Sequence, residues 1–240
     1  MQKFDVPYIA LSTRAGNLKT ELMTAYERVL DSGYYILSEE VREFEKCFAT
    51  YTGSSHAIGV GSGTGALHLI LMALGIGKND EVITVPNSFV ATAAVIALVG
   101  ARPVFVDINK DLNMNPSNIE SAITHRTKAI MPVHLTGRPA NMSAIMEIAE
   151  RHGLMVVEDA AQAVGAKWEN RPVGSFGVAN AFSCHPLKNL HAIGDAGVIT
   201  TNDTDLAIKL RMARNHGLKN RTQCDFWSIN CRLDEVHAAS

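Results

Sequence analysis

A lysine and an aspartate, each placed just after an apolar run, could together form a site for pyridoxal phosphate. Asp159 follows the run 154–157, and Lys188 follows a run that ends at Ser183 and precedes the glycine-containing segment 194–197. A lysine amine can hold the aldehyde of this cofactor as a Schiff base. A carboxylate can keep the pyridine nitrogen protonated, so that the ring acts as an electron sink. We therefore expect a cofactor site, for which the rest of the chain must supply a phosphate cradle, a ring contact and a substrate.

Each of these two residues also has a simpler interpretation. Glu158 and Asp159 could cap the next segment or chelate a metal ion. No histidine or cysteine nearby has the spacing of a metal ligand, so we expect no metal site. Lys188 could be an ordinary surface lysine. Its place between an apolar strand and a glycine-containing turn favours a functional role.

A glycine-rich segment could supply the phosphate cradle. Residues 61–65 read Gly-Ser-Gly-Thr-Gly and join a predicted strand to a predicted helix. Small residues there let backbone N–H groups approach an anion at the helix N-terminus, and the Thr64 hydroxyl could add a donor. The alternative is a strand–helix turn without a ligand, because short glycine patterns also arise by chance. Phe89, similarly, is either a core residue or a side chain that stacks on a flat cofactor ring.

The chain alternates between apolar runs of strand length and segments with helical spacing. This pattern predicts a three-layer α/β/α fold with a mainly parallel, mixed sheet. In such sheets ligands bind outside the carboxyl ends of the strands, where Asp159, Ser183 and the loop after Val60 would lie. We expect strands at 56–60, 81–85, 103–106, 128–133, 154–157, 179–183 and 197–201, and helices at 17–30, 39–51, 65–74, 89–99, 116–123, 142–152 and 203–216.

Composition restricts the class of protein. A net charge of −2 gives no basic surface for nucleic acid or anionic lipid, and 47% hydrophobic residues is an ordinary globular content. Four scattered cysteines without a C-x-x-C spacing are typical of reduced thiols. The start of the chain lacks a signal peptide, and the longest apolar stretch, 89–99, is too short to cross a bilayer. We expect a cytoplasmic protein with no nucleic-acid or membrane partner.

Motifs along nearly the whole chain resemble the DegT–StrS family of pyridoxal phosphate-dependent sugar aminotransferases, which have the aspartate-aminotransferase type of fold. Each motif is weak alone, but their order along the chain is specific. They are Gly33-Tyr34, Phe44-Glu45, Gly63-Thr64-x-Ala66-Leu67, Gly77-x-x-Asp80-Glu81-Val82-Ile83, Phe89-Val90-Ala91-Thr92-Ala93, Gly100-Ala101-x-Pro103-Val104-Phe105-Val106-Asp107, Glu158-Asp159-Ala160-Ala161-Gln162-Ala163, Ser183-x-His185-Pro186-x-Lys188-Asn189 and Asn230-x-Arg232-Leu233-Asp234. Ser38 and Ala196 stand where the family usually has glycine.

The resemblance implies a role for each candidate residue. Lys188 would be the Schiff-base lysine, and Asp159 would pair with the pyridine nitrogen. The other cofactor contacts would be Gln162 at the phenolic oxygen, Phe89 on the ring face, and the Gly63 and Thr64 amides with the Ser183 hydroxyl at the phosphate. In the family an asparagine reaches this phosphate from the neighbouring subunit, and Asn230 fits that position. A homodimer with shared sites is therefore expected.

The resemblance also implies an activity and a domain organisation. Residues 1–240 would form the pyridoxal phosphate-binding large domain of a type I transferase, which includes an N-terminal helical segment. The C-terminal small domain would be absent, because the chain stops within what looks like a helix after Arg232. The expected reaction converts a nucleotide-linked keto sugar to an amino sugar, with glutamate as donor, for cell-surface polysaccharide or secondary-metabolite sugars.

Two alternative functions stay open. One is a sugar dehydratase of the same family that uses the pyridoxamine form of the cofactor. Those members carry histidine in place of the Schiff-base lysine, so Lys188 counts against this reading. The other is a non-catalytic regulatory protein that binds the cofactor and keeps the fold.

Overall fold

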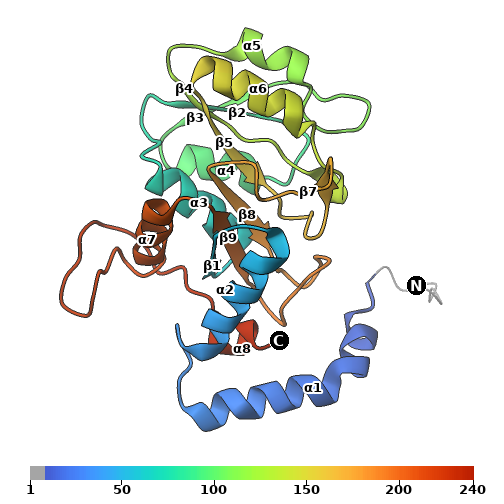
Figure 1. The fold of residues 1–240 in the computed structure, drawn as a ribbon, viewed down its shortest axis with the longest axis vertical. Helices are drawn as coiled ribbons and strands as arrows, with labels where there is room; N and C mark the ends of the chain where they lie inside the picture. The colour runs from blue at the N-terminus through green and yellow to red at the C-terminus, as the bar shows by residue number, and fades with distance from the viewer. Residues whose placement is uncertain (1–8) are drawn as a thin grey trace, which may run out of the picture.

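A sheet of seven strands forms the centre of the molecule (Figure 1). The computed structural model describes residues 9–240. The strands follow the order β1-β9-β8-β5-β4-β2-β3 across the sheet. Their bounds are β1 His56–Val60, β2 Glu81–Thr84, β3 Arg102–Phe105, β4 Thr127–Ile130, β5 Met155–Asp159, β8 Ala179–Ser183 and β9 Gly197–Thr201.

Six of these seven strands run in the same direction. The pairs β2–β3, β2–β4, β4–β5 and β5–β8 are parallel, whereas β9 is antiparallel to both β1 and β8. The carboxyl ends of six strands and the amino end of β9 therefore lie along one edge of the sheet. The expectation of a mainly parallel, mixed sheet is confirmed.

Three helices cover one face of the sheet. They are α3 (Gly63–Ala73), α4 (Ala91–Leu98) and α7 (Thr204–Ala213). Ser62 caps α3 by accepting a hydrogen bond from the Gly65 N–H, and Asp203 caps α7 in the same way through the Leu206 N–H. The helices bury apolar side chains against strand residues that include Ile58, Val82, Ala129, Val157, Ala181 and Ile199.

The opposite face is covered by α2 (Glu39–Thr52), α6 (Met142–His152) and the short α5 (Ile119–Ala122). Neighbouring strand residues point to opposite faces, so Ala181 packs in the first layer and Phe182 under α2. In the same way Val157 packs in the first layer and Val156 under α6. Both faces are buried, which explains the unbroken apolar strands and gives three layers.

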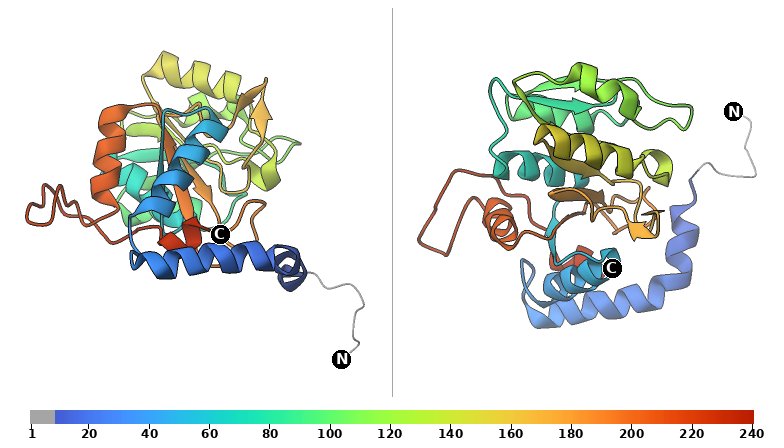
Figure 2. Two further views of the ribbon diagram at one scale, coloured as in Figure 1. Left: turned by 60° about the horizontal axis from the view of Figure 1, so that its bottom comes forward. Right: turned by 45° about the horizontal axis from the view of Figure 1, so that its top comes forward.

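Helix α1 (Leu11–Ser32) forms an arm outside these layers. Both views of Figure 2 place it alongside α2 and the short α8 (Glu235–Ala238). It ends at Gly33, which adopts the left-handed conformation with φ of 66°. The buried Glu235 of α8 accepts hydrogen bonds from the Ser38 and Glu40 amides at the start of α2. The segment after Arg232 thus holds α2 in place.

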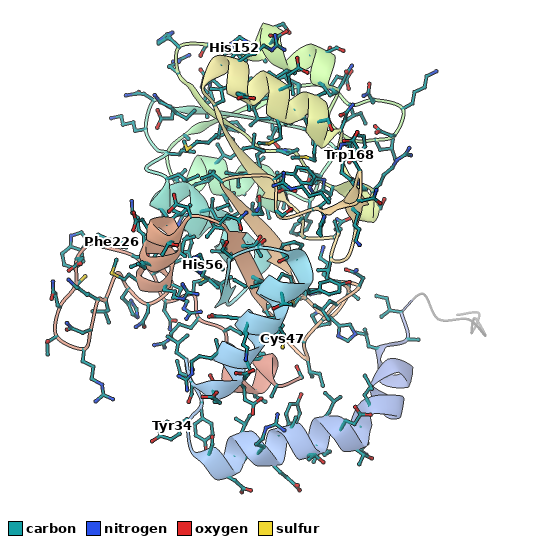
Figure 3. All side chains as sticks on the ribbon, in the orientation of Figure 1. Tyr34, Cys47, His56, His152, Trp168 and Phe226 are labelled. Atoms are coloured by element: carbon teal, nitrogen blue, oxygen red, sulfur yellow. The ribbon has the colours of Figure 1, made fainter. Side chains whose placement is uncertain are left out.

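The sequence reasoning missed a hairpin of two very short strands, β6 (Lys167–Trp168) and β7 (Arg171–Pro172). Both residues of its turn, Glu169 and Asn170, have positive φ, of 48° and 67°. Figure 3 shows Trp168 beside α6, where its indole N–H donates to Ser143 Oγ at 2.8 Å. Two-residue strands are too short for the alternation that identifies a strand in a sequence.

Other boundaries also differ from the expectation. The helix expected at 89–99 begins only at Ala91, and the helix expected at 116–123 is a 3₁₀ turn (η1, Pro116–Asn118) followed by α5. Strand β5 continues to Asp159 instead of ending at Val157. No helix within residues 9–240 has the length and hydropathy needed to span a bilayer.

Candidate active site

The edge of the sheet that collects six carboxyl ends holds a cavity of about 430 Å³. Its walls come from the segments that follow β1, β2, β5 and β8 and from the residues just before β9. Seven of the eight residues that the sequence singles out line it. These are Gly63, Thr64, Phe89, Asp159, Gln162, Ser183 and Lys188. The cofactor roles that the resemblance implies for them stay predictions.

Asp159 is the buried carboxylate of this cavity, with 5% of its surface exposed. Its Oδ2 accepts a hydrogen bond from Thr92 Oγ1 at 2.7 Å, and its Oδ1 accepts one from the Ala161 N–H at 3.2 Å. Burial raises the pKa of Asp159 above its ordinary value, while the two hydrogen bonds and the nearby His134 and Lys188 oppose that rise. The carboxylate is therefore fixed in orientation and costly to keep charged.

The neighbouring Glu158 points to the other face of β5, as alternation along a strand requires. It is fully buried, and its oxygens accept from His134 Nε2 at 2.9 Å and from the amides of Gly174, Phe176 and Gly177. Burial opposes its charge, but these bonds hold the pKa of Glu158 below its ordinary value. The Ala140 N–H donates to His134 Nδ1, so the ring proton is on Nε2 and faces Glu158. Glu158 fastens a loop and takes no part in the cavity.

The start of α3 has the features of an anion site. Its first two residues, Gly63 and Thr64, line the cavity, and the dipole at a helix N-terminus favours negative charge. A Cβ on Gly63 would lie 2.7 Å from Ser183 Cβ, and a Cβ on Gly197 would lie 2.4 Å from the Ser62 carbonyl carbon. Only glycine fits at these two positions, because the end of β8 and the start of β9 press against the first turn of α3.

Ser183 and Lys188 complete the cavity from the side of β8. The Ser183 Oγ accepts a weak hydrogen bond from the His185 N–H at 3.3 Å, which leaves its own proton free to donate. Lys188 follows in a turn closed by its backbone N–H to the His185 carbonyl at 2.8 Å. Among the described residues no carboxylate forms an ion pair with the half-buried Lys188 amine. The amine is therefore available to a ligand in the cavity.

Gln162 and Phe89 line the same cavity from the segments that follow β5 and β2. The Gln162 Oε1 accepts from the Thr136 N–H at 2.8 Å, so the free end of its amide is the hydrogen-bond donor Nε2. Thr136 has a φ of 53°, which is uncommon for a β-branched residue. Phe89 lies in the turn before α4 and is 66% exposed, so the alternative of a core residue is wrong. Its ring is free to cover a flat ligand.

Asn230 does not line the cavity. It is exposed and forms a bridge with Asn215, at the base of the loop that leaves the body after α7 (Figure 1). Trp227 on the same loop is 91% exposed. Asn230 is therefore exposed and outside the cavity of its own chain.

Sequence reasoning missed several residues of the cavity wall, among them Ser88, Thr92 and Asp195. Thr92 could have been found from the sequence, because it is a polar residue inside the apolar run 89–99. Asp195 lies in the glycine-containing segment before β9 and had no distinguishing pattern. Within residues 9–240 no group of three or more histidine, cysteine, aspartate or glutamate side chains could hold a metal ion.

Comparison with known proteins gives close relatives over almost the whole chain. It is 48% identical, over 98% of its length, to a pleiotropic regulatory protein of Geobacillus stearothermophilus, and covers 63% of that protein. It is 45% identical, over 98% of its length, to the dTDP-3-amino-3,4,6-trideoxy-alpha-D-glucose transaminase of Streptomyces venezuelae, and covers 62% of it. The chain thus spans less than two thirds of the length of these relatives.

The same relationship appears in three dimensions. The crystal structure of S. venezuelae DesV matches 98% of the chain with a TM-score of 0.95 at 45% identity, and the chain covers 63% of it. Residues 17–240 match the DegT/DnrJ/EryC1/StrS aminotransferase family, whose enzymes depend on pyridoxal phosphate. With the cavity at the carboxyl edge of a mixed sheet and a fold shared with these aminotransferases, the chain belongs to the DegT/DnrJ/EryC1/StrS aminotransferase family.

Proposed function

We propose that this chain is the cofactor-binding large domain of an aminotransferase that converts a nucleotide-linked keto sugar to an amino sugar. The observation that carries the proposal is the convergence of three groups on one cavity. They are the free amine of Lys188, the buried carboxylate of Asp159 and the N-terminus of α3. An amine, a carboxylate and an anion site are the three groups that pyridoxal phosphate requires.

The residues present fit this cofactor. The cavity of about 430 Å³ suits a small flat molecule. Lys188 would hold the aldehyde, Asp159 the pyridine nitrogen and Gln162 Nε2 the phenolic oxygen. Phe89 would cover the ring face, and the phosphate would take the Gly63 and Thr64 amides with the Ser183 hydroxyl. When bound, pyridoxal phosphate supplies an electron sink for the bonds at the amino-bearing carbon.

The protein residues supply the proton transfers and the electrostatics. Lys188 Nζ, once free, removes a proton from the amino donor at its α-carbon and later delivers one to the sugar carbon. The charged form of Asp159 holds a proton on the ring nitrogen. Small residues around Gly63 let backbone N–H groups reach the phosphate without a side chain between them.

The substrate proposal rests on the S. venezuelae relative, whose name specifies a dTDP-linked amino sugar. Glutamate is proposed as the amino donor, for the synthesis of polysaccharide or secondary-metabolite sugars in the cytoplasm. We also propose a homodimer in which Asn230 reaches the phosphate of the neighbouring subunit, supported by its exposed position outside its own cavity.

The alternatives have weaker support. The dehydratase reading requires histidine where this chain has Lys188. The regulatory reading has the name of the Geobacillus relative in its favour. The lysine and the carboxylate are both present in the cavity, and relatives such as the S. venezuelae protein carry transaminase names, which favours catalysis.

Borohydride trapping tests the cofactor proposal. The full chain, incubated with pyridoxal phosphate and reduced, should yield one labelled peptide, which contains Lys188. Lys188→Arg should abolish the label, and Lys167→Arg, on the exposed hairpin strand β6, is the matched control that should leave it unchanged. Labelling at another lysine would contradict the assignment.

A second assay tests the activity. The full chain is given glutamate and a panel of dTDP- and UDP-linked keto sugars, and the aminated product is identified by mass. Amination that requires Lys188 supports the proposal. Because the chain spans less than two thirds of the length of its relatives, the panel is also given to the full-length protein, and trapping at Lys188 without amination by that protein would favour a regulatory protein.

A further inference from the structure

Two hydroxyls in the wall of the cavity, which the functional assignment above does not use, form a hydrogen-bonded chain that ends at Asp159. Ser88 Oγ lies 2.7 Å from Thr92 Oγ1, and Thr92 Oγ1 lies 2.7 Å from Asp159 Oδ2. Thr92 is 1% exposed and Ser88 is partly buried. All three line the cavity.

The chemistry of these groups fixes the direction of both hydrogen bonds. A carboxylate only accepts, so the single proton of the Thr92 hydroxyl points at Asp159 Oδ2. The Thr92 oxygen is then an acceptor toward its other neighbour, and Ser88 must donate to it. The chain therefore runs from Ser88 through Thr92 to Asp159, with each hydroxyl polarised by the next.

The two hydroxyls belong to one tight turn at the start of α4. The Ser88 N–H donates to the Pro86 carbonyl at 3.0 Å, and the Thr92 N–H donates to the Phe89 carbonyl at 3.1 Å. Phe89 lies in the same turn and is the proposed ring contact. The turn thus carries both the proposed ring contact, Phe89, and the hydroxyl of Thr92, which donates a hydrogen bond to the Asp159 carboxylate.

We propose that Thr92 is a positioning residue, with Ser88 behind it, that keeps the Asp159 carboxylate charged and aimed at the cofactor nitrogen. The inference rests on the proposed function. Thr92 occupies Oδ2 and the Ala161 N–H occupies Oδ1, so the carboxylate cannot rotate without breaking one of the two bonds. Each oxygen keeps a further lone pair, which is what a protonated ring nitrogen requires.

Keeping the buried Asp159 carboxylate charged is energetically costly. Burial raises the pKa of Asp159, and the Thr92 hydroxyl opposes that rise most strongly among its partners. The other charged or titratable groups that act on Asp159 are His134, from the turn after β4, and Lys188, from the segment after β8. The pKa of Asp159 should therefore rise further when the Thr92 hydroxyl is removed.

Two substitutions separate the hydroxyl from the shape of the side chain. Thr92→Val keeps the volume and removes the donor, whereas Thr92→Ser keeps the donor. Thr84→Val is the matched control, because Thr84 is also buried and its hydroxyl also donates one hydrogen bond, to the Met131 carbonyl at 2.9 Å. Any general cost of losing a buried hydroxyl appears in this control as well.

The first readout is cofactor affinity, measured on the full chain by titration with pyridoxal phosphate. A hydrogen bond to a charged group contributes about 1.5–3 kcal/mol, so Thr92→Val should weaken binding by about tenfold or more. Thr92→Ser should stay close to the parent, Ser88→Ala should fall between them, and Thr84→Val should bind like the parent. Equal losses in Thr92→Val and Thr92→Ser would overturn the proposal, because the methyl packing would then be responsible.

The second readout needs no cofactor. Infrared spectra of the chain labelled with ¹³C-carboxyl aspartate follow the protonation of the buried carboxyl as pH changes, with Asp159→Asn identifying its band. In Thr92→Val the band should titrate at higher pH than in the parent and in Thr84→Val. An unchanged titration would overturn the proposal even if the chain is a pyridoxal phosphate enzyme. Failure to trap the cofactor on Lys188 would overturn the proposed function, but it would not affect the infrared titration of Asp159, which needs no cofactor.

Discussion

Replacing Asp159 with asparagine should stabilise the cofactor-free protein while it slows the reaction. The pKa of Asp159 is raised by burial, and the Thr92 and Ala161 hydrogen bonds only partly offset this. A carboxyl whose pKa is higher in the folded than in the unfolded chain binds more protons when folded. Its contribution to the free energy of unfolding therefore falls as pH rises from the unfolded pKa through the folded pKa. At neutral pH the charged carboxylate is a net cost.

The size of the effect follows from two opposing terms. Asparagine removes a buried charge, whose effective penalty is several kcal/mol, but it also loses charge-assisted hydrogen bonds of about 1.5–3 kcal/mol each. One oxygen becomes an NH₂ group, and Thr92 can still accept from it if the Ser88–Thr92 chain reverses its direction. Because burial outweighs the hydrogen bonds, the balance should be a gain of about 1 kcal/mol, or roughly 2–4 °C in Tm for a chain of this size.

Thermal unfolding of the cofactor-free full chain at several pH values tests this. Asp159→Asn should unfold at a higher temperature than the parent at neutral pH, and the difference should vanish at low pH, where the parent carboxyl is protonated in both states. Asp203→Asn is the control, since aspartate and asparagine cap helices about equally well and Asp203 caps α7. Amination by Asp159→Asn should fall by about 100-fold or more, since the charge-assisted hydrogen bond to the ring nitrogen contributes about 1.5–3 kcal/mol and its loss also weakens the electron sink. A variant that is less stable at neutral pH, or that turns over normally, would refute the reasoning.

Three further outcomes are expected. Gly63→Ala should weaken cofactor binding at least about tenfold because its Cβ would lie 2.7 Å from a side chain of β8, whereas Gly16→Ala, with nothing within 4 Å in helix α1, should bind normally; equal affinities would contradict the close packing. Glu158→Gln should lower Tm by about 6–12 °C, because an NH₂ group would face two buried donors and the loss of such a buried interaction costs about 3 kcal/mol. A Tm within about 2 °C of the parent corresponds to a loss of less than about 1 kcal/mol and would count against this prediction. Mixing full-length Lys188→Ala and Asn230→Ala chains should restore part of the activity if sites are shared between subunits. No gain over Asn230→Ala alone, once subunit exchange is proven, would exclude a contact of Asn230 with the neighbouring subunit's phosphate.

The sequence predicted the sheet well because burial on both faces leaves a strong signal. The strands at 56–60, 179–183 and 197–201 have the expected bounds, and the edge where their loops meet holds the cavity. The strand expected to end at Val157 continues through Glu158 and Asp159. The two charged residues after Val157 suggested that the strand ends there. The amides of Gly174, Phe176 and Gly177 and the His134 ring, all distant in sequence, satisfy Glu158, and no pattern within the strand encodes them.

The site was predicted less completely, for a related reason. Residues with unusual chemistry, such as Lys188, or with unusual backbone demands, such as Gly63, are visible in a sequence. Thr92 acts through a partner 67 positions away, so its importance becomes apparent only when α4 lies beside β5. The role of Asn230 stays a prediction, because its proposed ligand belongs to another subunit.

The reversed strand β9 affects when the proposed cofactor site can form during synthesis. β1 pairs with β9, and His56 lies opposite Thr201. At 5–20 residues per second a ribosome needs roughly 7–30 s to make the intervening chain, during which β1 and the start of α3 lack their partner. Gly197 of the same strand presses on Ser62 and closes the anion site. A ligand of this proposed anion site would therefore bind chains that have completed β9, and its binding free energy would protect those chains from unfolding and proteolysis.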